Sequence, residues 1–453
     1  MTLPNYFLAD LPPEATLSAT MLHDACQTLR HNREKYLLPR TTQSIIRTLS
    51  HLASEWREST NPFRQIALEA GPAATGFSRQ TLAAGLDGFF EAITTEHLQA
   101  LVDQDLGHLQ RLETLTTTET EQRADRASHA RGPELLVHIT GGVLPNPALT
   151  SIILGLLTRS AQFVKCASGT ALLPRLFAHS LYQAEPKLGA CLEIAEWKGG
   201  TSALDTALFA EADCLTATGH DETLAALRQK IPARTRFLGY GHRLSFAYVT
   251  QEVLSGFHPH KIIASAARDV VAWDQLGCLS PHVIYVETGG RVAPEDFAAK
   301  LATELAACER THPRGQLAPE AAAAIAARRG FYEVRAANSR ETKLWTSPGS
   351  TAWTVVFETE PLFQLSCLHR FIYVKAVADL KQALEAADAV RGKVSTVGLA
   401  APEDRALSLA HELARWGVTR ICPLGHMQNP PLRWRHDGRP SLGDLVTWTD
   451  WEL

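Results

Sequence analysis

The spacing of apolar residues separates a helical first third of the chain from a longer part in which strands and helices alternate. Amphipathic helices are predicted where apolar side chains recur every three or four residues, in 17–32, 42–58 and 79–94. The glycines of 71–76 are expected to interrupt these helices, and the polar segment 113–131 to form an exposed helix or a connector. We therefore predict a mostly helical segment over 1–130 that packs on the domain that follows.

From residue 135 on, short apolar runs alternate with helical patterns. Strands are expected at 135–140, 162–166, 191–197, 214–218, 236–239 and 247–250, with helices at 147–159, 172–182, 201–209 and 221–230. This alternation is typical of a parallel α/β sheet with helices on both faces. It indicates an α/β domain over 131–260.

A second α/β region follows over 261–420. It has helical patterns at 294–309, 319–329 and 376–387, and strand patterns at 353–358 and 370–374. The tail, 421–453, is rich in proline, glycine and tryptophan, and its Trp434, Trp448 and Trp451 are expected to pack it onto the body of the protein.

Composition narrows the class of protein. The chain has 453 residues, of which 45% are hydrophobic and 20% charged, so a large core is available. The net charge of −4 gives no electrostatic argument for nucleic acid or an anionic membrane as partner. No apolar run approaches the roughly 18 residues of a membrane span, and 1–10 do not resemble a secretory signal. The eight cysteines are scattered, which favours a reducing cytoplasm and no metal site, and the pair His258 and His260 fits a solvated loop.

One cysteine, Cys278, stands between an apolar helical run and the apolar strand at 283–286. Gly277 precedes it and allows backbone to come close to whatever the sulfur holds, and Pro281 stiffens the entry into the strand. A thiol on such a turn is reachable at the edge of a sheet, as a covalent nucleophile requires. The alternative is a buried structural cysteine on a tight turn.

Three loops of the first α/β domain each follow a predicted strand and precede a helix or turn. In a doubly wound sheet such crossover loops line the ligand crevice, and helix N-termini there meet anionic groups. Taken singly, each also fits an ordinary turn or a solvated lysine. Their order along the chain, followed by Cys278, is more specific than any one of them. The residues concerned are Gly141 and Gly142, Lys165 and Ser168, and Thr218 and Gly219.

This order resembles that of the aldehyde dehydrogenase superfamily over 135–287. More narrowly, the chain is similar to the fatty acyl-CoA reductases of the LuxC type. The closer resemblance is carried by Trp-Lys-Gly-Gly at 197–200, Asp-Gln-Leu-Gly-Cys-Leu-Ser-Pro at 274–281, and the tail motifs at 420–427 and 434–438. It implies an aldehyde dehydrogenase-like fold, with a Rossmann-type cofactor domain and an α/β catalytic domain beside the helical N-terminal segment.

The resemblance also implies an activity, the NADPH-dependent reduction of an activated fatty acyl group to an aldehyde. Cys278 falls on the catalytic cysteine, Lys165 on the lysine that holds the adenosine ribose, and Thr218 and Gly219 near the turn that packs on the cofactor phosphates. An acyl-CoA or acyl-protein thioester is then the substrate, with an acyl-protein synthetase as a possible partner and a homo-oligomer as the expected assembly. The rival readings are an oxidative, hydrolytic or CoA-acylating aldehyde dehydrogenase and a non-catalytic subunit.

Departures from the superfamily pattern refine this reading. The stretch 237–245 lacks the glutamate that activates water in hydrolytic relatives, which suits an enzyme that must keep its acyl-enzyme from hydrolysis. Ser168 stands where NAD-specific relatives have a glutamate, which fits the 2′-phosphate of NADPH. Asn146 is a displaced candidate for the oxyanion side chain. His242 and His282 are candidate proton donors, or else structural histidines.

Overall fold

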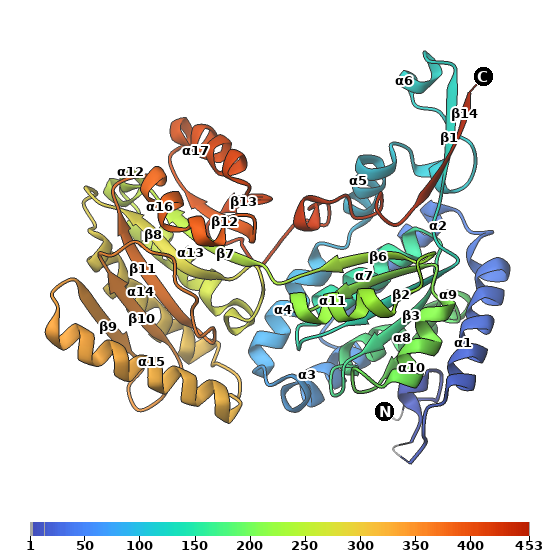
Figure 1. Cartoon of the computed structure of the whole chain (residues 1–453), viewed down its shortest axis with the longest axis horizontal. Coiled ribbons are helices and arrows are strands. Elements are labelled where there is room, and N and C mark those ends of the chain that lie inside the picture. The colour runs from blue at the N-terminus through green and yellow to red at the C-terminus, as the bar shows by residue number, and fades with distance from the viewer. Residues whose placement is uncertain (1–2, 13, 453) are drawn as a thin grey trace. The chain divides into compact units, whose positions relative to one another are not determined.

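The computed structural model describes residues 3–12 and 14–452. Its chain divides into two compact units (Figure 1). The first comprises Met1–Thr75, Leu86–Gly241 and Pro431–Leu453. The second comprises Gly76–Gly85 and His242–Pro430. Both units are therefore assembled from segments that are distant in the sequence.

The first unit is built on a five-stranded parallel sheet in the order β4-β3-β2-β5-β6. The chain first adds β3 and β4 on one side of β2 and then adds β5 and β6 on the other side. The strand order therefore reverses between β2 and β5. At such a reversal the loops diverge and leave room for a ligand at the carboxyl ends of the strands. The strands are β2 (Leu135–Thr140), β3 (Ala161–Cys166), β4 (Leu192–Glu196), β5 (Cys214–Thr218) and β6 (Arg236–Tyr240).

Helices cover both faces of this sheet, as the sequence predicted. One face packs against α1 and α10 in a common apolar core, and α7 and α8 contact β2, β3 and β4. Pro147 stands in the first turn of α7, where its missing N–H costs no hydrogen bond. The crossover helices are α7 (Asn146–Leu157), α8 (Leu172–Ala184), α9 (Pro186–Gly189), α10 (Ser202–Glu211) and α11 (Asp221–Lys230).

The N-terminal segment is mostly helical. Its helices are α1 (Ala19–Asn32), α2 (Thr42–Arg57), α3 (Pro62–Thr75), α4 (Arg79–Glu91), α5 (Thr95–Leu106) and the short α6 (Glu119–Gln122). The predicted interruption at 71–76 is confined to Gly76, because α3 continues through Gly71 and Pro72 and ends at Thr75. Phe63, Ala67 and Gly71 are buried along α3, and this packing holds the helix together despite two poor helix formers.

The polar segment that we expected to be a helix or connector ends in a strand. Strand β1 (Arg126–Arg131) pairs antiparallel with β14 (Thr447–Glu452) to form a separate two-stranded sheet. The prediction that Trp451 packs onto the body is also wrong, since Trp451 is 52% exposed. Trp448 is 40% exposed, and its ring centre lies 5.8 Å from the guanidinium carbon of Arg111. Neither error was visible locally, because each strand exists only through its distant partner.

The second unit contains a seven-stranded sheet in the order β13-β12-β7-β8-β11-β10-β9, parallel except for the edge strand β9. The strands are β7 (Leu244–Val249), β8 (Pro281–Glu287), β9 (Thr342–Thr346), β10 (Thr354–Glu358), β11 (Phe371–Val377), β12 (Val394–Ala400) and β13 (Arg420–Pro423). The strand β8 is buried along its whole length. The predicted second α/β region, 261–420, contains most of this sheet. However, β7 comes from the predicted first α/β domain and β13 runs into the predicted tail, because both strands pair with β12.

Two apolar cores lie on opposite faces of this sheet. One contains residues of α12, α13 and α14, and the other contains residues of α15, α16 and α17. The helices are α12 (Gln251–Ser255), α13 (Pro259–Val271), α14 (Pro294–Thr311), α15 (Pro319–Asn338), α16 (Leu380–Ala386) and α17 (Glu403–Trp416). Among the helices that the structure describes, none is both long and apolar enough to cross a bilayer.

Candidate active site

The thiol of Cys278 lies in a tight turn between the 3-10 helix η4 (Ala272–Gln275) and β8. The amide of Ser280 donates to the carbonyl of Gly277 (2.9 Å), and Ser245 Oγ donates to the carbonyl of Cys278 (2.8 Å). Cys278 is exposed, whereas the cysteines of the first unit's sheet are buried. The turn therefore presents a sulfur to solvent while its backbone is tied to β7.

The buried cysteines are poor nucleophiles by comparison. Burial raises the pKa of Cys166 to about 11 and that of Cys191 and Cys214 to about 12. Because the thiolate is the reactive form, these three sulfurs stay protonated and unreactive near neutral pH. The exposure of Cys278 and the raised pKa values of the three buried cysteines together favour Cys278 as the reactive thiol.

Two runs of left-handed backbone flank the Cys278 turn. Trp273, Asp274 and Gln275 have φ angles of 52°, 49° and 65°, and Leu368, His369 and Arg370 have φ angles of 59°, 53° and 65°. A residue with a β-carbon costs about 1–2 kcal/mol in this conformation. Such strain persists only where the surroundings hold it. The first run comes directly before the Cys278 turn, and the second before β11, the neighbour of β8.

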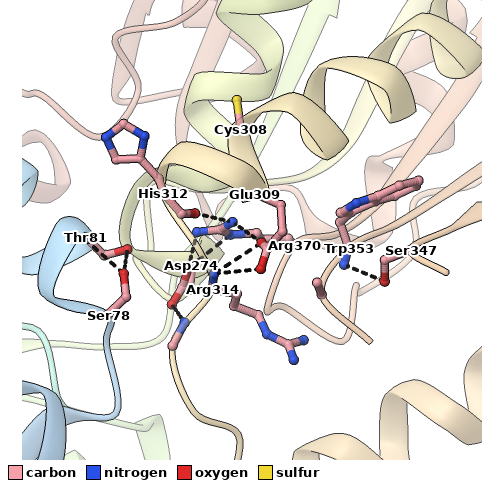
Figure 2. Close-up of polar contacts among 12 residues, drawn as sticks. Ser78, Thr81, Asp274, Cys308, Glu309, His312, Arg314, Ser347, Trp353 and Arg370 are labelled. Atoms are coloured by element: carbon pink, nitrogen blue, oxygen red, sulfur yellow. Dashed lines mark hydrogen bonds and ion pairs between the residues drawn. The ribbon is translucent and has the colours of Figure 1, made fainter. Parts of the chain in front are cut away.

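A buried ion pair joins the two strained runs (Figure 2). Arg370 donates to Asp274 Oδ1 from Nη2 (2.7 Å) and Nε (3.0 Å), and from Nη1 to Glu309 (2.7 Å). The other carboxylate oxygen of Asp274 accepts from the amide of Gly315 (3.0 Å). Since Asp274 and Arg370 are nearly inaccessible to solvent, each charge depends on the other. The pair therefore fixes the entry into the Cys278 turn.

Gln275 ties the same turn to the sheet. Its Nε2 donates to the carbonyls of Pro281 (2.8 Å) and Phe371 (2.9 Å). His282, the second residue of β8, is buried, and its Nδ1 accepts from the amide of Ser366 (3.1 Å). Burial lowers the pKa of His282 to about 4, with a further contribution from His242. His282 is therefore neutral at neutral pH, and its Nδ1 is occupied as an acceptor.

In the first unit, the loops after β2 and β3 line one pocket that opens to solvent. Gly142 and Gly169 take φ angles of 80° and 81° there, and Gly200, after β4, takes 85°. Apart from the glycine itself and its two neighbours in the chain, no heavy atom of the described residues lies within 4 Å of the place where a β-carbon would stand at any of the three. These loops leave open space at the carboxyl ends of three neighbouring strands. They fit a ligand that approaches backbone closely, such as a dinucleotide.

Lys165 lies at the end of β3 with its amine beside Trp197. The Nζ atom is 5.5 Å from the centre of the indole ring, and the indole donates to Asp205 Oδ1 (2.9 Å). The other oxygen of Asp205 accepts from the amide of Gly200 (3.1 Å). Burial lowers the pKa of Lys165, against the attraction of Asp205, Cys166 and Glu196. The motif at 197–200 thus forms a fixed wall next to the lysine.

Glu196 was missed in the sequence analysis. Its carboxylate accepts from the amides of Gly169 (2.7 Å) and Ala171 (3.1 Å), and so it holds the loop that carries Ser168. Ser168 itself is exposed. A carboxylate therefore stands at this end of the sheet although position 168 lacks one. The signal was its place at the end of a strand next to β3, which only the strand order reveals.

The remaining predicted residues lie at the strand ends of the first unit or near β8. A β-carbon on Gly141 would stand 3.3 Å from the carbonyl oxygen of Thr218, which brings the loops after β2 and β5 together. Asn146 begins α7, and its Oδ1 is buried without a hydrogen-bond partner among the described residues. Gly219 follows β5 directly, and its amide donates to the carbonyl of Tyr240 (3.2 Å). His242 lies within electrostatic range of His282.

Within residues 3–12 and 14–452, no group of three or more His, Cys, Asp or Glu side chains is arranged to hold a metal ion. The rings of His258 and His260 lie 5.6 Å apart.

The family model described as acyl-CoA reductase (LuxC) matches residues 37–448. The long-chain acyl-protein thioester reductase of Aliivibrio fischeri is 24% identical over 366 residues, which cover 78% of this chain and 70% of that protein. The long-chain acyl-protein thioester reductase 2 of Photobacterium leiognathi is 24% identical over 324 residues, covering 70% and 63%. The match thus extends over about two thirds of the length of these relatives.

Solved structures show the same fold. A mutant of proline utilization A from Bradyrhizobium japonicum aligns with a TM-score of 0.70 at 17% identity, covering 96% of this chain and 45% of that one. An NAD-dependent benzaldehyde dehydrogenase from Corynebacterium glutamicum aligns with a TM-score of 0.68 at 12% identity, covering 97% and 91%. The predicted aldehyde dehydrogenase-like fold is confirmed.

Proposed function

Because the chain belongs to the acyl-CoA reductase (LuxC) family, we propose that it reduces a fatty acyl thioester to the aldehyde with NADPH, through an S-acyl intermediate on Cys278. The donor is an acyl-CoA, as the description of the family suggests, or an acyl-protein, as the names of the relatives suggest. The observation that carries the proposal is the exposed thiol of Cys278 on a turn held by buried charges and hydrogen bonds. We further propose that the protein works in the cytoplasm as a homo-oligomer and receives acyl groups from an acyl-protein synthetase.

The chain's own residues supply the covalent chemistry. The Cys278 thiolate attacks the thioester carbonyl, and backbone N–H groups of its turn stabilise the oxyanion. A new sulfur–carbon bond forms, the old one breaks, and the donor leaves as a thiol after taking up a proton. The exchange is nearly balanced in energy because one thioester replaces another. A bound nicotinamide cofactor supplies the hydride that reduces the acyl carbon. The hemithioacetal on Cys278 then collapses to the aldehyde and free thiol.

The two histidines differ as proton donors. His282 is neutral and its Nδ1 accepts from Ser366, so it has one ring N–H and little tendency to gain a second proton. We therefore propose His242 as the donor to the departing thiolate or nascent alkoxide. Asn146 remains our proposal for a side-chain amide at the oxyanion.

For the cofactor, we propose that Lys165 and Ser168 contact the adenosine ribose. The open glycine loops after β2 and β3 support a close approach of the dinucleotide, with Gly141 and Gly142 in the first of them. Thr218 and Gly219 are proposed to meet the phosphates. The proposed preference for NADPH rests on Ser168, which leaves position 168 without a carboxylate that would bind the ribose hydroxyls. Glu196 does not replace that carboxylate in the proposal, because both of its oxygens already accept backbone amides.

Incubation with a long-chain acyl-CoA, followed by intact-protein and peptide mass spectrometry, tests the proposal. We expect one acyl adduct on Cys278, no adduct in Cys278→Ser, and a normal adduct in the control Cys367→Ser, a half-buried cysteine of the same unit. Adding NADPH should release aldehyde. An adduct on Cys166, Cys191 or Cys214 instead would refute the assignment.

The isolated acyl-enzyme separates this function from that of a hydrolytic aldehyde dehydrogenase. Without a carboxylate in 237–245 to remove a proton from water, hydrolysis lacks an effect typically worth about 10²–10⁴-fold. The adduct should persist in buffer and be discharged by NADPH or by added CoA. Rapid release of free fatty acid in buffer would favour the hydrolytic reading.

A further inference from the structure

The tail motif that begins at Arg420 folds into a closed loop after β13. Arg420 donates from Nη1 to the carbonyl of Met427 (2.6 Å) and from Nη2 to that of His426 (2.9 Å). Asp269 of α13 accepts from the amides of Gly425 (2.5 Å) and Met427 (2.9 Å). Arg420 and Asp269 are both buried, so a cation and a carboxylate hold the carbonyl and amide groups of the same few residues.

This loop ends at Gln428, which contacts the Cys278 turn. Its Nε2 donates to Ser280 Oγ at 2.5 Å, and both side chains are buried. A β-carbon on Gly277 would stand 2.5 Å from the same nitrogen. Gln428 therefore packs on the residue before Cys278 and bonds a residue shortly after it. Gly277 is explained by this contact, since a side chain there would displace the glutamine from Ser280.

The loop also brings positive charge towards the sulfur. Burial lowers the pKa of Arg420, and attraction to Cys422, Asp269 and Cys278 opposes this effect. The guanidinium that closes the loop thus lies within electrostatic range of the Cys278 thiol. The packing of Gln428 and the positive charge of Arg420 therefore both act on the Cys278 turn.

We propose that Gln428, held by the loop that Arg420 and Asp269 close, is a positioning residue for the nucleophile Cys278. This role rests on the proposed function, in which Cys278 accepts the acyl group. By fixing Gly277 and Ser280, Gln428 aligns the sulfur and the backbone N–H groups beside it with the thioester. Misplacement of a reacting group by about 1 Å can cost around a hundredfold in rate.

The experiment compares Gln428→Met, Ser280→Ala and the double variant with the native protein. Gln428→Met keeps the length of the side chain but removes the hydrogen bond. Gln382→Met is the matched control, because Gln382 also makes a single anchoring bond, from the amide of Ala378 (2.6 Å), elsewhere in the same unit. Hydrogen exchange of the peptide containing 276–280 reports on the turn without substrate. Single-turnover acylation by acyl-CoA and alkylation by iodoacetamide report on the sulfur.

We expect faster exchange in the turn in both single variants, no further increase in the double variant, and no change in the control. The maximal rate of acylation should fall at least about tenfold at an unchanged apparent KM. Alkylation, which needs only an accessible and ionised thiol, should stay within about twofold. Unchanged exchange or additive effects would overturn the proposal, as would alkylation that falls in step with acylation. If the native protein forms no acyl adduct, the proposed function fails, while exchange and alkylation still decide whether Gln428 holds the turn.

Discussion

The two sheets carry their candidate functional residues at opposite ends of their parallel strands and build them in opposite ways. In the first unit, the loops after β2, β3 and β4 use left-handed glycines with open space around them. In the second unit, the segments before β8 and β11 use left-handed residues with full side chains, which are joined by ions and hydrogen bonds. The loops of the first unit leave open space for a ligand, whereas the segments of the second unit are filled by their own side chains.

The difference follows from what each task requires. A loop that accepts a dinucleotide must let backbone come close to it, and glycine permits this at little cost. A nucleophile must stay in one place before the substrate arrives, which strain and buried charge can enforce. Strain of about 1–2 kcal/mol per residue over two short runs must be held by surrounding contacts. The Asp274–Arg370 ion pair is the contact that joins the two runs directly.

Breaking that contact should have the largest effect. Arg370→Ala leaves Asp274 and Glu309 without their buried partner, and we expect a loss of about 3–5 kcal/mol in the free energy of unfolding. Urea denaturation measures it. Asp274→Ala with Arg370→Ala should cost less than the sum of the single losses. Strict additivity would show that the two strained runs are held independently.

Acid should weaken the same region through His282. Its pKa is lowered in the folded state to about 4 from 6.5, so the unfolded chain binds the proton more readily. The stability is fully present above pH 6.5 and is lost as the pH falls towards 4. At 1.36 kcal/mol per unit, the native protein should lose up to roughly 3 kcal/mol over this range relative to His282→Gln. Parallel stability curves for the two proteins would contradict the buried, neutral imidazole.

A charge added to an open loop should change ligand preference more than stability. Ser168→Glu places a carboxylate on an exposed site, and we expect NADPH binding to weaken about tenfold relative to NADH, because solvent screens the repulsion. Titration of both cofactors measures the ratio. Ser59→Glu, on the loop between α2 and α3, is the control for net charge. An unchanged ratio would remove Ser168 from the ribose site.

The smallest effect separates backbone strain from ligand binding. Gly142→Ala and Gly349→Ala introduce the same methyl group at φ angles of 80° and 64°. In both cases no described atom beyond the residue itself and its chain neighbours lies within 4 Å of the new carbon. Each should cost about 1–2 kcal/mol of stability. Only Gly142→Ala should also weaken cofactor binding, by a few fold. Equal binding by both variants would place the dinucleotide elsewhere.

The sequence patterns predicted local features of the molecule. The strands of the first sheet, its crossover helices and an accessible Cys278 follow from apolar spacing and from turn residues, as do β8, β10 and β11 of the second sheet. The strands β9, β12 and β13 were not predicted. The sequence patterns did not predict contacts between residues that are distant in the sequence. Asp274 and Arg370 are 96 residues apart. Asp274 begins the motif at 274–281, but nothing in either segment indicates that the two side chains pair.

The same limit applies to Glu196 and Gln428. Glu196 acts on a loop of the neighbouring strand, so its role depends on strand order and not on spacing. Gln428 lies 148 residues from Ser280 in sequence and stood just outside the motif that we singled out. Residues that hold a site in place carry a weaker sequence signal than residues that perform its chemistry.

The pairing of β1 with β14 bears on how the chain is made. Strand β1 is translated more than 300 residues before residues 447–452, its partner. At typical rates of synthesis, the edge of β1 that pairs with β14 stays without that partner for roughly 15–60 s. An unpaired edge invites the wrong neighbour, and charged ends discourage it. Arg126 and Arg131 stand at the two ends of β1. Their positive charges therefore discourage β1 from pairing with another strand before β14 is made.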